Sequence, residues 1–321
     1  MDNLCHTLVG AALAESGLKR RTTLGTATLL IGANFPDIDV VAVPLGHGLG
    51  FRRGITHAIP ALIVLPFVLT GIMLLWHRAR AARRDGPAPA ASQLLLLSAI
   101  SMATHPVLDW MNTYGMRWFM PFSGWWSYID VLFIIDPWIW AALLAGVLWS
   151  RRRERPWRRR SSTGRAPAWV NVPARVALAL VIVYIGIMVA LSRATKREIA
   201  SILRSRGVDP VALLASPVPI DPFRRRVVYE RDGEYVFAEF DWRASPRLSD
   251  DLLRVPRQTD DRLARLAAAT PAGQEFLSWS RLPFYSFERH GDSAVVYIAD
   301  ARYAAGTRGS WASVRVVVPL R

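Results

Sequence analysis

The N-terminal part of the chain carries long runs of apolar residues separated by short polar segments. A membrane-spanning helix needs about 20 consecutive, mostly apolar residues. Two short apolar runs, 3–18 and 22–36, come first and predict a helical hairpin that crosses or re-enters the membrane. The pattern therefore predicts an all-α polytopic membrane helical bundle with four clear spans and a short N-terminal hairpin. The four predicted spans cover residues 55–76, 93–110, 131–149 and 172–192.

From about residue 193 the pattern changes to short runs in which apolar and polar residues alternate. Such alternation with a period of two is typical of half-buried β-strands. Amphipathic helical stretches at 195–207 and 260–269 accompany these runs. We therefore expect a membrane-embedded domain over residues 1–192 and a small soluble α+β domain over residues 193–321. The alternating runs are 226–230, 234–242, 293–300 and 313–320.

Positive charge is concentrated beside the apolar runs. The chain has 40 Lys and Arg residues against 25 Asp and Glu residues, a net charge of +15, although 52% of its residues are hydrophobic. Basic clusters at 19–21, 78–84 and 151–160 are typical of cytoplasmic loops. One topology places all three clusters in the cytoplasm and leaves the C-terminal domain outside. Because topology explains the arginines, we expect contact with membrane lipids and no binding of nucleic acid.

Several ionisable residues lie within or beside the apolar runs, at the predicted outer ends of their segments. A charged side chain inside a membrane costs at least about 2.5–3.5 kcal/mol, so such groups normally pair or bind a ligand. His105 and Asp109 are four residues apart and project from one helix face. Imidazoles combined with carboxylates suit zinc and also accept manganese or iron. We therefore predict a divalent-metal site, with His6, Asp37, His57, His105 and Asp109 as candidate ligands.

The same residues also have structural interpretations. A buried network of histidines and carboxylates could hold the helices together without a metal. Asp39 could cap or solvate a loop, Asp130 could cap a helix, and Asp136 before Pro137 could cap or kink one. Cys5 is the single cysteine, so it excludes an intrachain disulfide and a cysteine-rich zinc module. An HExxH metalloprotease is not expected, because the motif is missing from the sequence.

Six short motifs follow one another along residues 1–150. They are MDNLCHTLVGA (1–11), ANFPDID (33–39), RRGITHA (52–58), THPVLDWMNTYG (104–115), MPFS (120–123) and IIDPW (134–138). In this order they resemble the bacterial YdjM-like family. The resemblance implies a membrane-bound, metal-dependent hydrolase of the bacterial inner membrane, and it does not extend to the C-terminal region.

That family is in turn distantly similar to zinc-dependent phospholipase C and P1-type nucleases, which are helical bundles with three zinc ions. By this resemblance, one zinc would be held by Asp37, His57, His105 and Asp109. A second zinc would share Asp109 with His6. The sequence departs from the soluble enzymes because five residues precede His6 and no histidine occurs between positions 105 and 290. The resemblance therefore implies one or two ions and not a complete three-metal site.

The chemistry expected of such a site is hydrolysis. A metal with an open position lowers the pKa of bound water from 15.7 to about 7 and polarises a phosphoryl oxygen. Asp39 or Asp136 could take the proton of this water, and Arg52, Arg53 and Arg117 could hold a phosphate. We predict a hydrolase acting on a phosphoester or lipid-like substrate. The alternative is a non-catalytic membrane protein or a transporter that uses a buried His/Asp network.

Overall fold

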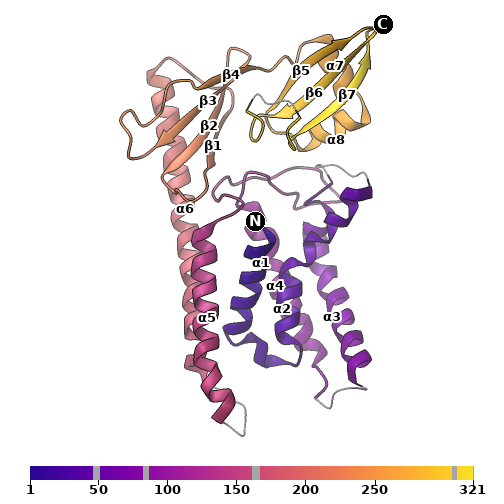
Figure 1. Cartoon of the computed structure of the whole chain (residues 1–321), viewed down its shortest axis with the longest axis vertical. Coiled ribbons are helices and arrows are strands. Elements are labelled where there is room, and N and C mark those ends of the chain that lie inside the picture. Colours follow the sequence, from indigo (N-terminus) through magenta and orange to yellow (C-terminus); the bar gives the residue numbers. More distant parts are fainter. Residues whose placement is uncertain (46–50, 82–86, 161–166, 306–308, 321) are drawn as a thin grey trace. The chain divides into compact units, whose positions relative to one another are not determined.

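The chain forms two compact units in the computed structural model, which describes residues 1–45, 51–81, 87–160, 167–305 and 309–320. The first unit consists of Met1–Val40 and Arg53–Met188, and the second of Val41–Arg52 and Val189–Arg321. The first unit is helical, whereas the second contains β-sheets (Figure 1).

The helical unit begins with the predicted hairpin. Helices α1 (Asn3–Glu15) and α2 (Gly25–Asn34) are joined by the 3₁₀ turn η1 (Leu18–Arg21) and pack against each other. Four longer helices follow in the chain (Figure 1). They are α3 (Ile59–Ala81), α4 (Ala91–Trp110), α5 (Pro137–Arg160) and α6 (Val172–Ser205), and the remaining 3₁₀ segments are η2 (Phe35–Leu45), η3 (Ile55–His57) and η4 (Ala168–Asn171).

Three helical segments of the described residues are long and apolar enough to cross a membrane. They are Ile59–Arg80, Ala91–Trp110 and Ala168–Ser205, and they correspond to the predicted spans 55–76, 93–110 and 172–192. The fourth predicted span, 131–149, is not confirmed. Its first residues are not helical, because α5 begins only at Pro137, and the arginines from Arg151 onward leave a short apolar segment.

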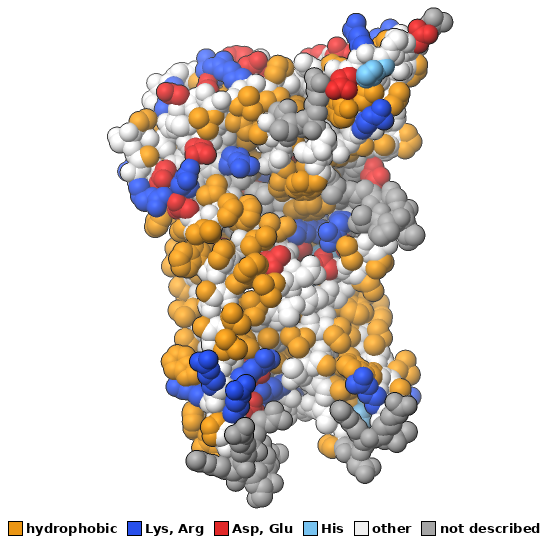
Figure 2. Space-filling view, viewed as in Figure 1, with side chains coloured by type: hydrophobic (Ala, Val, Ile, Leu, Met, Phe, Trp, Pro, Cys, Tyr) orange, Lys and Arg blue, Asp and Glu red, His pale blue; other side chains and the backbone are white. Residues whose placement is uncertain are grey.

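Large apolar side chains are exposed along α3 and α6. Ile63 and Phe67 on α3 expose 64% and 61% of their surface, and Ile182 on α6 exposes 71%. Figure 2 shows hydrophobic side chains over the helices, with lysine and arginine side chains gathered near one end of them. Continuous exposed apolar surface of this kind is rare in soluble proteins. It agrees with helices that face lipid.

Two glycines allow close approach between helices, one between α1 and α2 and the other between α2 and α4. A Cβ atom on Gly10 of α1 would lie 2.6 Å from the carbonyl oxygen of Leu29 in α2. One on Gly32 of α2 would lie 2.1 Å from the hydroxyl oxygen of Ser101 in α4. Any side chain at either position would therefore push helices apart. This close packing brings the ends of α1, α2 and α4 together.

Ion pairs fasten the hairpin turn to α5. Lys19 Nζ donates hydrogen bonds to Glu15 Oε2 at 2.5 Å and to Glu154 Oε2 at 2.6 Å. Arg151 Nε donates to Glu15 Oε1 at 3.0 Å. The basic clusters 19–21 and 151–160 therefore lie at the same end of the helical unit.

The second unit contains two antiparallel sheets. In the four-stranded sheet the strand order is β1-β2-β3-β4, and in the three-stranded sheet it is β5-β6-β7. The predicted strands at 226–230, 234–242, 293–300 and 313–320 are confirmed as β2, β3, β6 and β7. The strands are β1 (Leu213–Pro217), β2 (Arg224–Arg231), β3 (Glu234–Asp241), β4 (Leu253–Pro256), β5 (Pro283–His290), β6 (Ser293–Asp300) and β7 (Ser313–Pro319), and the helices are α7 (Arg262–Ala268) and α8 (Pro271–Trp279).

The end of α6 forms part of the core of the second unit. Ile199 and Leu203 are fully buried in one cluster with Val227 of β2 and with Val236 and Phe240 of β3. The amphipathic stretch predicted at 195–207 is thus the C-terminal part of α6. It covers the four-stranded sheet with its apolar side.

Candidate metal centre

Two imidazoles and two carboxylates meet at one end of the helical unit. His105 and Asp109 lie near the C-terminus of α4, His57 ends η3, and Asp37 lies in η2 just after α2. One ligand atom from each of these four residues lies within 4.8 Å of the others. His57, His105 and Asp109 are buried, and Asp37 is partly exposed. We call this group the four-residue cluster; it could hold a metal ion.

The spacing of the ligand atoms is close to that of a tetrahedral metal site. The Nε2 atoms of His57 and His105 are 3.2 Å apart. Asp37 Oδ1 lies 3.7 Å from each of these nitrogens, and Asp109 Oδ2 lies 3.6 Å from each. Tetrahedral zinc with bonds of about 2.0–2.1 Å separates neighbouring nitrogen ligands by roughly 3.3 Å. Small side-chain movements would bring all four donors to bonding distance.

A backbone contact fixes the tautomer of His105. The Nδ1 atom of His105 lies 2.7 Å from the carbonyl oxygen of Ala33. A carbonyl can only accept a hydrogen bond, so Nδ1 carries the proton. In the neutral ring, Nε2 then keeps its lone pair and points it into the cluster. This arrangement is the usual way in which a protein orients a metal-binding histidine.

His57 is oriented from behind by Asp39 and Thr56. Its Nδ1 atom lies 3.0 Å from Thr56 Oγ1 and 3.5 Å from Asp39 Oδ2. Asp39 is buried, and its Oδ2 atom also accepts a hydrogen bond of 2.9 Å from the backbone N–H of Arg53. The carboxylate favours a proton on Nδ1, which leaves Nε2 of His57 to face the cluster. The structure thus places Asp39 on the side of His57 away from the cluster; its predicted role as a proton acceptor stays a prediction.

Two members of the cluster, His57 and Asp37, have the protonation states that a metal requires. Burial lowers the pKa of the His57 imidazole below its ordinary value, and its contact with Asp37 only partly opposes this shift. For Asp37, burial raises the pKa, but its contacts with the imidazoles of His105 and His57 outweigh burial and lower the pKa overall. At neutral pH the imidazole of His57 is therefore neutral and the carboxyl of Asp37 is ionised. Metal ligands must be in these forms.

His6 lies on the other side of Asp109. Its Nε2 atom is 3.3 Å from Asp109 Oδ1, whereas Asp109 Oδ2 faces His57 and His105. The rings of His6 and His105 stack with centroids 3.7 Å apart. The α-amino group of Met1 also contacts Asp109 Oδ1. The two oxygens of Asp109 therefore face two different groups of donors, as a bridging carboxylate would.

Arg53 forms an ion pair with Asp109, a member of the four-residue cluster. Its Nε atom lies 2.8 Å from Asp109 Oδ2, and its Nη1 atom donates a 2.9 Å hydrogen bond to Asn112 Oδ1. The guanidinium lies 4.7 Å from the centre of the Tyr114 ring. Arg53 therefore balances the charge of Asp109 from within the protein, and its predicted role of holding a substrate phosphate stays a prediction.

The other two predicted phosphate-binding arginines lie outside these contacts. The Arg117 guanidinium lies 4.8 Å from the centre of the Trp126 ring, and the backbone N–H of Arg117 donates to the carbonyl of Arg53 at 3.3 Å. Arg52 belongs to the second compact unit. Substrate binding by Arg117 and Arg52 stays a prediction.

Comparison with known proteins identifies the family. A family model described as "YdjM inner membrane protein" matches residues 1–197, which contain every candidate ligand. The chain belongs to the YdjM inner membrane protein family. The match confirms the family resemblance that the sequence motifs predicted. It also confirms the prediction that the chain is a membrane protein.

One relative is the "Uncharacterized protein YfhP" of Bacillus subtilis (strain 168). It is 26% identical over 160 residues, which cover 46% of this chain and 45% of the relative. The chain thus spans less than half the length of this relative. No solved structure matches the chain. The distant similarity of the YdjM family to P1-type nucleases therefore stays a prediction.

Asp136 of this YdjM family member has a structural contact on each oxygen. Its Oδ1 atom accepts hydrogen bonds from the backbone N–H groups of Trp138 at 3.1 Å and Ile139 at 3.2 Å, so it caps the N-terminus of α5. Its Oδ2 atom accepts a 3.0 Å hydrogen bond from the Tyr184 hydroxyl in α6. These contacts match the capping interpretation of the sequence, and the catalytic role remains untested.

Replacing Asp136 with alanine distinguishes the two roles. The loss of an N-cap should lower the free energy of unfolding by about 0.5–2 kcal/mol. Metal content should stay at the wild-type value, because Asp136 does not belong to the four-residue cluster. Thermal unfolding and metal analysis on the same purified sample check both expectations. Unchanged stability together with lost metal would contradict the capping role.

Asn112 and Thr56 are residues of the site that were not predicted from the sequence. Asn112 is buried and bonds Arg53, and Thr56 contacts His57. Asn112 follows Asp109 by three residues, so helical spacing could have drawn attention to it. Nothing in the local sequence around Thr56 distinguishes it from an ordinary loop threonine. The carbonyl of Ala33 carries no side-chain signal either.

Proposed function

We propose that this YdjM family member is a membrane-bound, metal-dependent hydrolase that acts on a phosphoester or lipid-like substrate. The observation that carries the proposal is the convergence of four ligand atoms within 4.8 Å of one another. The two imidazole Nε2 atoms are 3.2 Å apart, and each lies 3.6–3.7 Å from a carboxylate oxygen of Asp37 and of Asp109. Two imidazoles and two carboxylates suit zinc, with manganese as the second choice. We expect one ion in the four-residue cluster, and if a second ion binds, we expect Asp109 and His6 to hold it.

Each residue of the site has a task in this proposal. His57 and His105 provide Nε2 atoms that face the cluster, and Asp37 and Asp109 provide carboxylate oxygens. A bound zinc would supply a water of lowered pKa and polarise a phosphoryl oxygen. Of the two predicted proton acceptors, we retain Asp39, because Asp136 uses both of its oxygens in capping and anchoring.

The location proposed for the site is the outer side of the bacterial inner membrane. The cluster lies at the ends of the helices opposite to the basic hairpin turn and the basic end of α5, which meet through Lys19 and Glu154. The positive-inside rule places that basic end in the cytoplasm. We therefore propose a multi-pass topology with the C-terminal domain outside. Membrane lipids are then the nearest source of phosphoesters.

A specific contact favours the alternative, a structural network without a metal. Asp109 already pairs with Arg53 at 2.8 Å, so its charge is balanced by the protein alone. A network of this kind would keep the helices together and would not require turnover. Metal content and turnover therefore have to be measured on the same sample.

The test is lipid hydrolysis by the full chain in nanodiscs after loading with zinc or manganese. We expect release of phosphorylated headgroups, loss of release after chelation, and recovery when the metal is added back. His77→Ala is the matched control, because His77 is a histidine of α3 outside the cluster. It should bind metal and turn over substrate like the wild type. Bound metal without turnover of any phosphoester would refute the proposed hydrolase. If the protein binds no metal, the structural network without a metal would be the better account of the cluster.

A further inference from the structure

Asp37 is the member of the site through which the cluster meets its surroundings. The side chains of His6, His57, His105 and Asp109 expose at most 1% of their surface. Asp37 keeps 11% of its side chain exposed. Its Oδ1 atom faces His57 and His105, and its Oδ2 atom accepts a 3.2 Å hydrogen bond from the Asn3 side-chain amide. Of these five side chains, Asp37 is therefore the one that a molecule from outside can contact.

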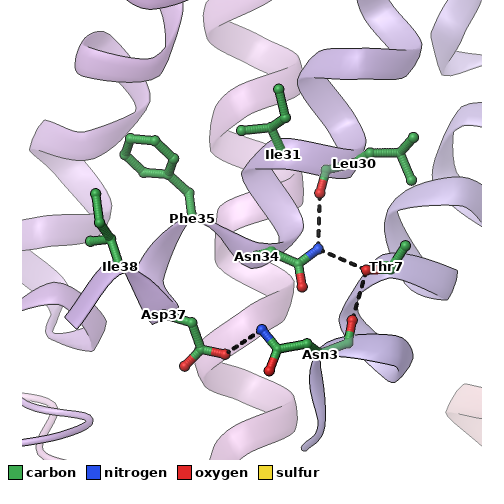
Figure 3. A pocket seen from close by; sticks show the side chains of 8 residues that line it. All are labelled: Asn3, Thr7, Leu30, Ile31, Asn34, Phe35, Asp37 and Ile38. Atoms are coloured by element: carbon green, nitrogen blue, oxygen red, sulfur yellow. Dashed lines mark hydrogen bonds between the residues drawn. The ribbon is translucent and has the colours of Figure 1, made fainter. Parts of the chain in front are cut away.

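A pocket of about 500 Å³ lies beside Asp37, between α1, the end of α2 and the start of η2. Figure 3 shows Asn3 and Thr7 from α1 on one side and Phe35 and Ile38 on the other. Ligand pockets commonly have volumes of about 300–1,000 Å³. The pocket is therefore large enough for part of a lipid molecule.

The apolar wall of this pocket is exposed. Ile31 exposes 38% of its surface and Ile38 exposes 48%, and Leu4, on the neighbouring turn of α1, exposes 49%. In a membrane protein, exposed large apolar side chains are the ones that contact lipid chains. The pocket thus has an apolar side and, at Asp37, a carboxylate of the metal cluster. An amphiphile, with its apolar chain and polar headgroup, matches this arrangement.

A polar side chain in the pocket has an unpaired acceptor. Asn34 Nδ2 donates hydrogen bonds to the carbonyl oxygen of Leu30 at 3.0 Å and to Thr7 Oγ1 at 3.1 Å (Figure 3). Because a carbonyl only accepts, the orientation of the amide is fixed. Its Oδ1 atom is then buried without a hydrogen-bond partner. An unpaired buried acceptor costs free energy, which a donor on a ligand would recover after a small side-chain movement.

We propose that this pocket is the lateral route by which a phospholipid reaches the cluster from the bilayer. An acyl chain lies against Ile31, Phe35 and Ile38, and the headgroup lies toward Asp37. A hydroxyl donor on the headgroup bonds Asn34 Oδ1, so the preferred lipid is a glycerol-type phosphodiester. The reaction at the end of this route rests on the proposed function, whereas binding in the pocket does not.

Photo-crosslinking tests the route. The full chain is placed in nanodiscs with phosphatidylglycerol that carries a diazirine in one acyl chain, and the adducts are located by mass spectrometry. We expect adducts concentrated on residues 30–38 and reduced several-fold in Ile31→Trp and in Ile38→Trp. Ile187→Trp, at an exposed apolar position of α6 (58% exposed), is the matched control and should leave this pattern unchanged.

A second lipid tests the headgroup contact. Phosphatidylmethanol with the same diazirine chain carries no hydroxyl donor. We expect the yield at residues 30–38 to be higher with phosphatidylglycerol by about fivefold or more, the low end of the effect of an unpaired buried acceptor. Asn34→Leu should abolish this preference and keep the adducts themselves.

Metal content and turnover, measured on the same nanodiscs, separate this proposal from the proposed function. Adducts spread evenly over the exposed apolar residues of α3 and α6 would overturn the lateral route, even if a water-soluble phosphoester is hydrolysed. Adducts concentrated at residues 30–38 in a protein without metal or turnover would uphold the route and refute the hydrolase. Equal yields with both lipids would overturn the role of Asn34.

Discussion

Asp109→Asn is expected to lower the affinity for zinc by at least about 100-fold. The loss of a group that only hydrogen-bonds a metal ligand typically costs about 10–100-fold, and the loss of a ligand should cost more. The substitution removes the negative charge that faces His57 and His105 through Oδ2 and His6 through Oδ1. An amide keeps the shape of the side chain, so the packing of α4 changes little. Metal content by mass spectrometry and competition with a chromophoric chelator give the affinity.

Asp136→Asn is the matched control for this substitution. Asp136 is also a buried aspartate, but its oxygens accept hydrogen bonds from α5 and Tyr184. It should retain metal at the wild-type level. Should Asp109→Asn bind zinc as tightly as this control, Asp109 would not be a ligand. His105→Ala removes a different metal ligand. Loss of metal in this variant as well would show that the result for Asp109→Asn is not an effect on folding alone.

Asp300→Ala is expected to destabilise the second unit by about 3–5 kcal/mol, because it leaves the guanidinium of Arg302 buried without its partner. Asp300 Oδ1 accepts from Arg302 Nε at 3.0 Å, and Oδ2 accepts from Arg302 Nη2 at 2.9 Å. Oδ2 also accepts from the Ser280 hydroxyl at 2.8 Å and the Arg281 N–H at 2.7 Å. Domains are typically stable by only about 5–15 kcal/mol. Protease sensitivity of residues 189–321 in the full chain measures the loss.

An exposed ion pair of the same unit provides the control. Glu198 and Arg247 pair at 2.8 Å with 34% and 45% of their side chains exposed. Exposed pairs contribute about 0–1 kcal/mol, so Glu198→Ala should remain as resistant to protease as the wild type. Equal resistance of Asp300→Ala would show that the buried pair does not stabilise the unit.

The buried pair also predicts how stability depends on pH. Burial raises the pKa of Asp300, but the Arg302 guanidinium outweighs burial and lowers it below the ordinary value. The contribution of this carboxylate is therefore complete above the unfolded-state pKa of about 4 and is lost as the pH falls through the lower folded-state pKa. This part of the acid dependence should be missing in Asp300→Ala.

The sequence predicted the parts of the site that depend on regular structure. His105 and Asp109 share a helix face whatever the rest of the chain does, and the ends of the apolar runs placed His6, Asp37 and His57 at the same depth. These positions follow from helix periodicity and from the length of a span. The structure brings Asp37, His57, His105 and Asp109 together, and it places His6 beside them.

The parts that depend on irregular backbone could not be predicted. Arg53 has a positive φ of 52°, which no local pattern indicates, and it contacts Asp109 instead of lying open for a substrate. Asp39 lies 3.5 Å from Nδ1 of His57, although the two residues belong to separate 3₁₀ segments, η2 and η3. In the second unit β1, β4 and β5 were missed, because their sequences (LLASP, LRVP and PFYSFERH) do not alternate cleanly. The predicted fourth span is not confirmed for a local reason, because α5 begins only at Pro137.

The partner that fixes the tautomer of His105 is a main-chain carbonyl, that of Ala33. It belongs to the last turn of α2, where carbonyls have no partner within the helix. Every amino acid has this carbonyl, so a point substitution at position 33 changes the volume there and keeps the acceptor. Over evolution the histidine can therefore keep its partner while the identity of residue 33 drifts among small amino acids. A search for co-varying polar side chains among relatives would miss this contact.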